Sequence, residues 1–146
     1  MPLQHPYMTV AHPKLTEKER QVLGKPVLVH VGIVLPDGMP HVSAMWVDLD
    51  GDDIILNTAE GRTKANVLRV GSLVALSALD PENPYRNIGV RGRVIQVMTE
   101  EQGGGAGINR LAKKYLGVEE YPYRAPGELR VQFRVQPDVV SGWGKD

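Results

Sequence analysis

The sequence has no cysteine among its 146 residues, which excludes disulfide bonds, thiolate metal sites and cysteine nucleophiles. No apolar run approaches the roughly 18 residues that a membrane-spanning helix needs, and the N-terminal stretch lacks the layout of a signal peptide. Aromatic residues make up only 5%, and seventeen basic residues balance seventeen acidic ones. We therefore expect a cytoplasmic protein that binds neither nucleic acid nor a membrane and acts on a small molecule.

Common catalytic and metal-binding motifs are missing as well. His5, His12, His30 and His41 have no metal-ligand spacing with one another, and the carboxylates near them form no HExxH or facial-triad pattern. The sequence has no GxSxG, Walker A or GxGxxG motif. We expect no metal site, and we interpret the glycine run at 103–107 as a flexible segment leading into a helix.

The length of the chain indicates one domain with one hydrophobic core. Residues 1–15 show no periodic pattern, and we expect an N-terminal arm there. The domain would cover residues 16–146. It would begin with a short helix, because Thr16 and Glu19 make a capping box and Gly24 supplies a stop signal.

Six stretches have the composition and alternation of β-strands. The predicted strands cover residues 26–35, 39–49, 53–58, 72–80, 87–98 and 128–140, and two further helices are predicted over 59–69 and 107–115. Residues 80–86, DPENPYR, predict a proline-stiffened loop. Short turns between consecutive strands favour antiparallel pairing. A mainly β chain with few helices indicates a closed or partly closed barrel rather than a Rossmann sheet.

The stretch NTAEGRTKANVLRVG, at residues 57–71, has an unusual charge pattern. The first turn of a helix favours acidic residues, yet this one carries Arg62 and Lys64 beside the hydroxyl of Thr63. A bound phosphate would turn the repulsion into charge-assisted hydrogen bonds. The alternative is that both side chains point into solvent, where screening makes the repulsion small.

Four further arginines, Arg86, Arg91, Arg93 and Arg130, are candidates for an anion-binding groove. Arg91 and Arg93 alternate with valines and so project from one face of a strand. A solvated sheet face is the ordinary interpretation of this pattern. A groove that attracts an anionic ligand is the alternative.

Three segments together resemble the pyridoxamine 5′-phosphate oxidase-like split β-barrel family, in particular its small deazaflavin (coenzyme F420)-dependent branch. The segments are PHVSAMWVDLDGDDIILNTAEGRTKANVLR, ALDPENPYRNIGVRGRV and RLAKKYLGVEEYPYRAPGELRVQFRV. The resemblance implies a six-stranded antiparallel split β-barrel of the FMN-binding type. The chain departs from many relatives at Asn66 and Val67, where Arg-Asn is common.

The resemblance also implies where the cofactor lies. Its phosphate would bind at Arg62, Thr63 and Lys64, and the second and third strands would line its ring and sugar-like chain. On this basis the expected cofactor-binding residues are Val42, Ser43, Trp46, Asn57, Thr58, Ala59, Arg62, Thr63, Lys64 and Arg86.

The implied activity is hydride transfer from F420 to an organic acceptor such as an activated double bond. The alternatives are an FMN-dependent oxidase or reductase on the same scaffold, and a non-catalytic F420 or flavin carrier. The family pairs two barrels, so we expect a homodimer with the cofactor at the subunit interface. Tyr85, in the loop expected to approach the neighbouring subunit's cofactor, is the candidate catalytic proton donor, and a packing role is its alternative.

Overall fold

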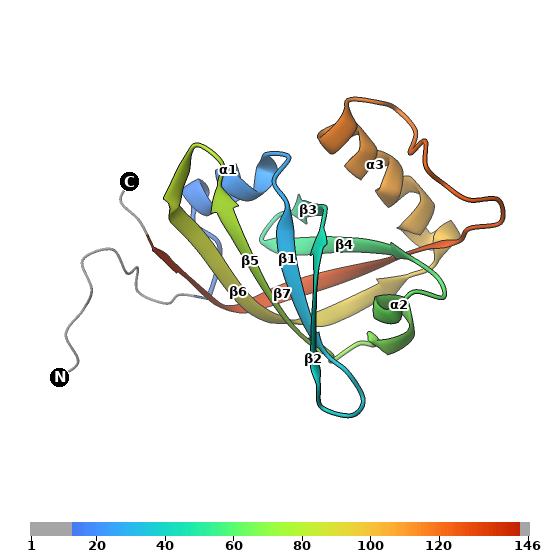
Figure 1. Ribbon diagram of the computed structural model, residues 1–146, viewed down its shortest axis with the longest axis horizontal. Helices are drawn as coiled ribbons and strands as arrows, with labels where there is room; N and C mark the ends of the chain where they lie inside the picture. The colour runs from blue at the N-terminus through green and yellow to red at the C-terminus, as the bar shows by residue number, and fades with distance from the viewer. Residues whose placement is uncertain (1–12, 144–146) are drawn as a thin grey trace.

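Seven strands form one antiparallel sheet in the computed structural model, which describes residues 13–143 (Figure 1). The strands are β1 (Val29–Val34), β2 (Pro40–Met45), β3 (Val47–Asp50), β4 (Asp53–Ala59), β5 (Leu73–Asp80), β6 (Asn83–Met98) and β7 (Arg130–Trp143). Their order in the sheet is β2-β1-β5-β6-β7-β4-β3. The predicted mainly β, antiparallel barrel with few helices is therefore confirmed.

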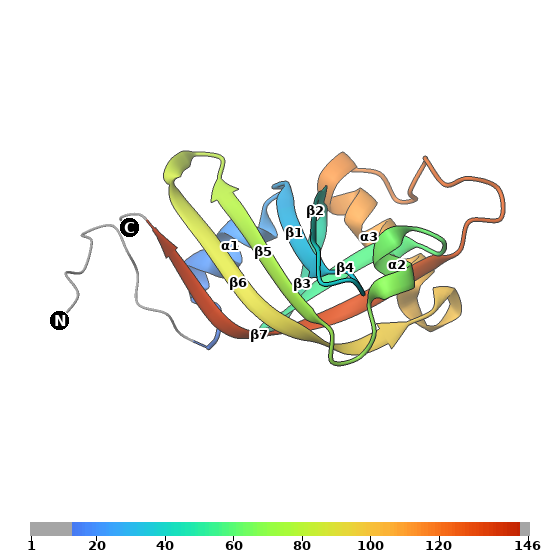
Figure 2. The same cartoon turned by 60° about the horizontal axis from the view of Figure 1, so that its bottom comes forward.

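The two edge strands of the sheet, β2 and β3, are separated in sequence by one residue, Trp46. A single residue cannot span a flat sheet seven strands wide. The sheet must therefore curl until its edges meet, and Figure 2 shows this curvature. Trp46 thus lies at the seam of the barrel.

The prediction of one strand over residues 39–49 was wrong, because the chain passes at Trp46 from one edge of the sheet to the other. This is why the sheet has seven strands rather than six. The more buried positions continue at every second residue through Met45 and Val47. The alternation in the sequence therefore gives no sign of the break.

The predicted loop at residues 80–86 is instead a tight hairpin, since β6 already begins at Asn83. Asp80 pairs with Asn83 and Leu79 with Asn87, so three residues bulge out of the ladder between them. Pro84 lies in this bulge, where a strand tolerates a residue that has no N–H to donate.

The hydrophobic core fills the inside of the curl, and helix α1 (Glu17–Gly24) covers part of it. The predicted capping box is confirmed: the Thr16 side chain accepts from the Glu19 backbone, and the Glu19 side chain accepts from Thr16 N. Most of the expected arm, residues 1–12, lies outside the described residues. Leu15 is only 4% exposed and belongs to the core, so the arm boundary at residue 15 was placed too late.

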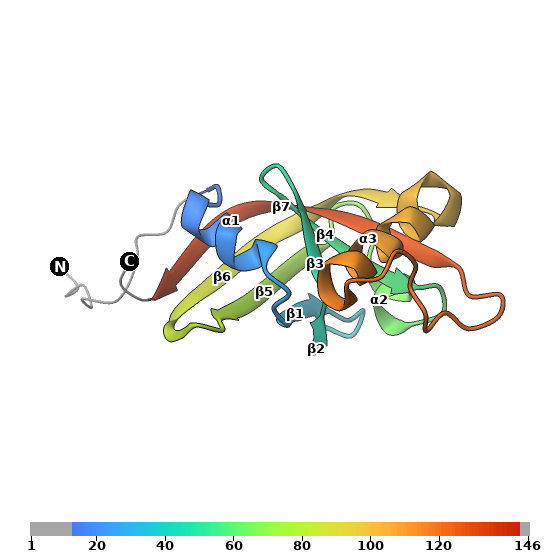
Figure 3. The ribbon, with the colours of Figure 1, turned by 90° about the horizontal axis from the view of Figure 1, so that it is seen from above.

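Two other helices contact β4. Helix α2 (Thr63–Val67) is shorter than the predicted 59–69, whereas α3 (Gly105–Leu116) starts before the predicted 107 and continues a π-helical turn, Glu100–Gly104. Seen from above, α1 and α3 lie on the same side of the sheet (Figure 3). No helix in residues 13–143 is long and apolar enough to cross a membrane.

Candidate functional site

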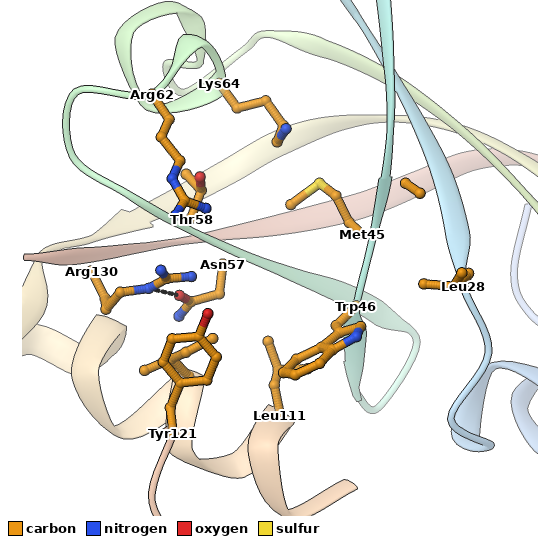
Figure 4. Close-up of a pocket in the computed structure, with 12 residues that line it drawn as sticks. Leu28, Met45, Trp46, Asn57, Thr58, Arg62, Lys64, Leu111, Tyr121 and Arg130 are labelled. Atoms are coloured by element: carbon orange, nitrogen blue, oxygen red, sulfur yellow. Dashed lines mark hydrogen bonds between the residues drawn. The ribbon is translucent and has the colours of Figure 1, made fainter. Parts of the chain in front are cut away.

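A pocket of about 230 Å³ lies where the barrel seam meets α2, α3 and the start of β7. It is lined by Leu28, Ala44, Met45, Trp46, Asn57, Thr58, Arg62, Lys64, Ile108, Leu111, Tyr121 and Arg130. Figure 4 shows two kinds of wall: Arg62, Lys64 and Arg130 present nitrogen atoms, whereas Trp46 and Leu111 present carbon.

The cationic wall has three positive side chains and one nearby carboxylate, that of Glu128. Arg130 is only 4% exposed, and its Nη1 lies 3.1 Å from Glu128 Oε2. Arg62 Nη2 lies 3.9 Å from the other oxygen, Oε1. Lys64 Nζ donates to the hydroxyl of Ser43 over 2.7 Å. A negatively charged ligand would complete the charge balance of this wall.

The pKa values of these cations show the cost of bringing them together. Burial lowers the pKa of Lys64, and the positive charge of Arg62 lowers it further. Burial also lowers the pKa of Arg130, although the hydrogen bond and charge of Glu128 oppose the shift. Burial disfavours the charged form of both side chains, and the charge of Arg62 further disfavours the charged form of Lys64. A bound anion would stabilise both charged forms.

The buried amide of Asn57 fixes Arg130 in place. Its Oδ1 accepts from Arg130 Nε over 3.0 Å, and its Nδ2 donates to Gly104 O over 2.9 Å and to Gln132 Oε1 over 3.3 Å. We conclude that Asn57 positions the arginine.

The glycine run lets α3 approach β7 closely enough to make these bonds. A Cβ atom at Gly104 would overlap the carbonyl oxygen of Arg130, and one at Gly107 would overlap the side-chain oxygen of Gln132. Both glycines are buried. The interpretation of 103–107 as a flexible lead-in was therefore wrong, because Gly104 and Gly107 are packed against β7, and only Gly103 within this run has a non-helical backbone (φ 152°).

The aromatic wall is built around Trp46. Its ring stacks on Tyr115 with the centroids 4.9 Å apart and an interplanar angle of 12°, and it meets Tyr121 edge-on at 6.1 Å. Tyr115 is held in turn, because its hydroxyl donates to Val27 O and accepts from Val47 N. Trp46 is thus held rigidly, and it offers a surface on which a planar ring could stack.

Five of the predicted cofactor residues line this pocket: Trp46, Asn57, Thr58, Arg62 and Lys64. A sixth, Ser43, lies beside it and holds Lys64. These residues come from four separate elements, the seam, β2, β4 and α2.

The other predicted residues do not line the pocket. Val42 alternates with Ser43 and points to the outer face of the sheet, and Thr63 is exposed. Ala59 is buried, and its carbonyl accepts from Arg62 N in the turn that leads into α2. Tyr85 is 80% exposed in the β5–β6 hairpin.

Arg86 was predicted to bind the cofactor but is engaged elsewhere within this chain. It lies in the same hairpin and pairs with Asp80 at 3.3 Å. Figure 1 shows this hairpin at the end of the sheet away from α2. Within one subunit, Tyr85 and Arg86 therefore lie outside the candidate site.

Glu128 and Tyr121 were not predicted as site residues, and Arg130 was named only among four arginines that could attract an anionic ligand. Arg130 and Gln132 alternate with buried valine and phenylalanine in β7, which marks a polar strand face. The sequence does not show that this face meets Asn57, 73 positions away. Among residues 13–143, no three His, Asp or Glu side chains are placed to hold a metal ion.

Comparisons with known proteins are consistent with this geometry. Residues 15–144 match the family model described as pyridoxamine 5′-phosphate oxidase. The chain is similar to a solved F420 reductase, with 32% identity over 86% of this chain and 98% of that chain, and a TM-score of 0.73. No curated protein matches.

Two more distant structures share the fold. A conserved hypothetical protein from Mycobacterium tuberculosis is 19% identical over 97% of this chain and 89% of that chain, with a TM-score of 0.68. An FAD binding protein from Mycobacterium smegmatis is 20% identical over 88% and 94%, with a TM-score of 0.56.

Proposed function

The chain belongs to the pyridoxamine 5′-phosphate oxidase family, and we propose that it is an oxidoreductase that binds coenzyme F420 and reduces an organic acceptor. The observation that carries the proposal is the excess of positive charge in a pocket that also has a flat aromatic wall. The 32% identity to an F420 reductase supports the deazaflavin over other cofactors.

The donor set of the pocket fits this cofactor. The side chains of Arg62 and Lys64 would hold its phosphate, and Trp46, Leu111 and Tyr121 would face its ring. Helix α2 has only five residues, so its macrodipole adds little, and the side chains themselves carry the attraction. The bound deazaflavin would supply the hydride, while the protein supplies position and electrostatics.

We also propose that two copies of the chain form a homodimer through the outer face of β2, β1 and β5. Val42, Gly32 and Ala75 lie side by side across these strands. Leu73 on β5 is 61% exposed. A flat face of small and apolar residues suits a second sheet, and a stable dimer needs about 800 Å² from each partner. A second subunit could also bring Tyr85 to a pocket that it does not reach within its own chain.

Light scattering after size-exclusion chromatography tests the dimer. The 16.1 kDa chain should be a dimer in the wild type and a monomer in Leu73→Glu, because the substitution places a charge in the dimer interface. The control Leu116→Glu, at the end of α3, should leave the dimer intact. A monomeric wild-type protein would contradict the proposal.

The cofactor is tested by titrating the purified protein with F420 and with FMN and following the quenching of their fluorescence. We expect tighter binding of F420, followed by oxidation of the reduced cofactor when enones, quinones or tetrapyrroles are added. Tighter binding of FMN would make the protein a flavin enzyme of the same family. Binding of F420 without turnover of any acceptor would make it a carrier.

A further inference from the structure

Glu128 does not line the pocket itself, but its carboxylate lies against two of the three cations that do. Its side chain is 11% exposed, and its two oxygens face Arg130 and Arg62. An acidic group in this position opposes the binding of any anion. Neutralising Arg130 does not by itself explain why a carboxylate lies in this position.

The backbone around Glu128 is tied down, so the carboxylate cannot easily leave when a ligand arrives. Arg124 donates to the carbonyl oxygen of Glu128 through Nε at 3.1 Å and Nη2 at 2.9 Å. Arg124 also pairs with Glu100, and the Glu100 carboxylate accepts from Arg130 N over 2.9 Å. The negative charge is thus a fixed part of the site.

Glu128 reduces the positive charge that a ligand meets. It compensates Arg130 directly and also faces Arg62, which is 59% exposed, so that solvent screens much of the Arg62 charge. Lys64 is half-buried, and its Nζ donates to a neutral hydroxyl, that of Ser43. Three cations and one carboxylate still leave the site positive, and Glu128 weakens the attraction of a ligand in proportion to the charge on the ligand.

We propose that Glu128 lowers the affinity of the pocket for a phosphate monoester, which carries nearly two negative charges, more than its affinity for a phosphate diester, which carries one. This inference rests on the proposed function. The repulsion between the carboxylate and a ligand is proportional to the charge on the ligand. A monoester at pH 7 carries about −1.5 to −2, so it meets nearly twice the repulsion.

The two candidate cofactors differ in the type of phosphate that they carry. The phosphate of FMN is a terminal monoester, whereas F420 carries its phosphate as a diester between the deazaflavin sugar chain and the acidic tail. Glu128 therefore acts as a specificity-determining residue that disfavours FMN.

The test compares the wild-type protein with Glu128→Gln, which removes the charge but keeps an oxygen that can accept from Arg130. Glu120→Gln is the matched control, because Glu120 is exposed in the same connection between α3 and β7. Dissociation constants for F420 and FMN are measured at pH 7.5 and constant ionic strength. In Glu128→Gln, the affinity for FMN should rise relative to that for F420 on the order of tenfold, and the control should show no change.

A second measurement does not depend on either cofactor. Methyl phosphate and dimethyl phosphate are titrated into the ¹⁵N-labelled protein by NMR, which also reports whether each variant is folded. Glu128→Gln should raise the affinity for methyl phosphate more than the affinity for dimethyl phosphate.

The outcomes separate this inference from the proposed function. If the wild type binds neither cofactor, but Glu128→Gln gains more affinity for methyl phosphate than for dimethyl phosphate, the function is refuted and the role of Glu128 is supported. A gain for methyl phosphate that is no larger than the gain for dimethyl phosphate overturns the inference.

Discussion

Two arginines four residues apart on β7 lie in opposite charge environments. Arg130 shares one carboxylate, Glu128, with Arg62 and lies in a pocket that also contains Lys64. Arg134 has two carboxylates to itself, since it pairs with Asp50 and with Asp53, the latter over 2.9 Å. The hydrogen bonds that Arg134 donates to these carboxylates raise its pKa, whereas burial lowers the pKa of Arg130.

The cavities beside the two arginines also differ in how far their charged residues are paired. The cavity near Arg134 is larger, about 690 Å³, but Asp48 and Asp50 in its wall already pair with Arg110 and Arg134. The smaller pocket near Arg130 has an uncompensated positive charge. This difference is the reason for proposing the smaller pocket as the binding site: its positive charge is left unbalanced by the protein, whereas the larger cavity is charge-balanced.

The largest effect is expected from removing the two cations on α2. The double variant Arg62→Ala, Lys64→Ala should weaken cofactor binding by roughly 3–4 kcal/mol, a few hundredfold, because two charge-assisted hydrogen bonds are lost. Fluorescence titration measures the affinity, and urea unfolding should show an apo protein that remains folded.

The matched control for this experiment removes two cations near the balanced cavity, in the variant Arg110→Ala, Lys113→Ala. Both residues lie on the exposed side of α3, and each pairs with a single carboxylate. Cofactor affinity should not change. A similar loss of affinity in both double variants would mean that total charge, rather than the pocket, attracts the cofactor.

The two arginines themselves should differ in their contribution to folding. Arg130→Ala should lower the free energy of unfolding by about 3 kcal/mol, because it leaves the Glu128 carboxylate buried beside a weaker partner. Arg134→Ala should lower it by about 1 kcal/mol or less, because Asp50 is exposed and regains solvent. Urea denaturation of both variants measures the difference. Equal losses of unfolding free energy would contradict the expected difference between the two arginines.

A smaller effect tests whether the glycine run supports the pocket. Gly107→Ala should cost roughly 2 kcal/mol of stability, because the new methyl group displaces Gln132 from its bond with Asn57. It should also weaken cofactor binding, because a displaced Asn57 would no longer hold the Arg130 side chain in place. Gly24→Ala is the control, since a Cβ there meets nothing within 4 Å. A neutral Gly107→Ala would show that α3 can shift freely.

The sequence predicted the parts of the fold that depend on local patterns. The capping box at Thr16 and the alternation in β5 and β7 depend on near neighbours, and the structure contains them. The break at Trp46 could not be predicted, because it is set by where the sheet edges meet and not by the residues around it. The early start of β6 was missed because Pro84 usually marks a loop.

The site was predicted in part for the same reason. Arg62 and Lys64 violate a local rule of helix charge, so the sequence alone drew attention to them. Arg130 violates no local rule, and its role follows from a contact with Asn57 across 73 positions. Tyr85 and Arg86 were expected at the site on the assumption of a second subunit, and within one chain they lie at the far hairpin.

The smallest expected effect is the pH dependence that Lys64 adds to binding. Its pKa lies below the ordinary 10.5 because of burial and Arg62. The unfolded chain therefore binds more protons between the lowered pKa and 10.5, and apo stability should rise with pH in that window. A bound anion favours the protonated lysine, so cofactor affinity should be highest below the lowered pKa and fall as pH rises through it.

The comparison with Lys64→Arg isolates this contribution. Arginine keeps its charge throughout the range, so the affinity of the variant should lack the part of the decline that Lys64 causes as pH rises through its lowered pKa. Burial also lowers the pKa of Lys114, which titrates equally in both proteins and cancels in their ratio. Fluorescence titrations at several pH values measure the ratio. Parallel declines in the two proteins would mean that Lys64 does not contact the anion, and the unbalanced charge would then have to be assigned to Arg62 and Arg130 alone.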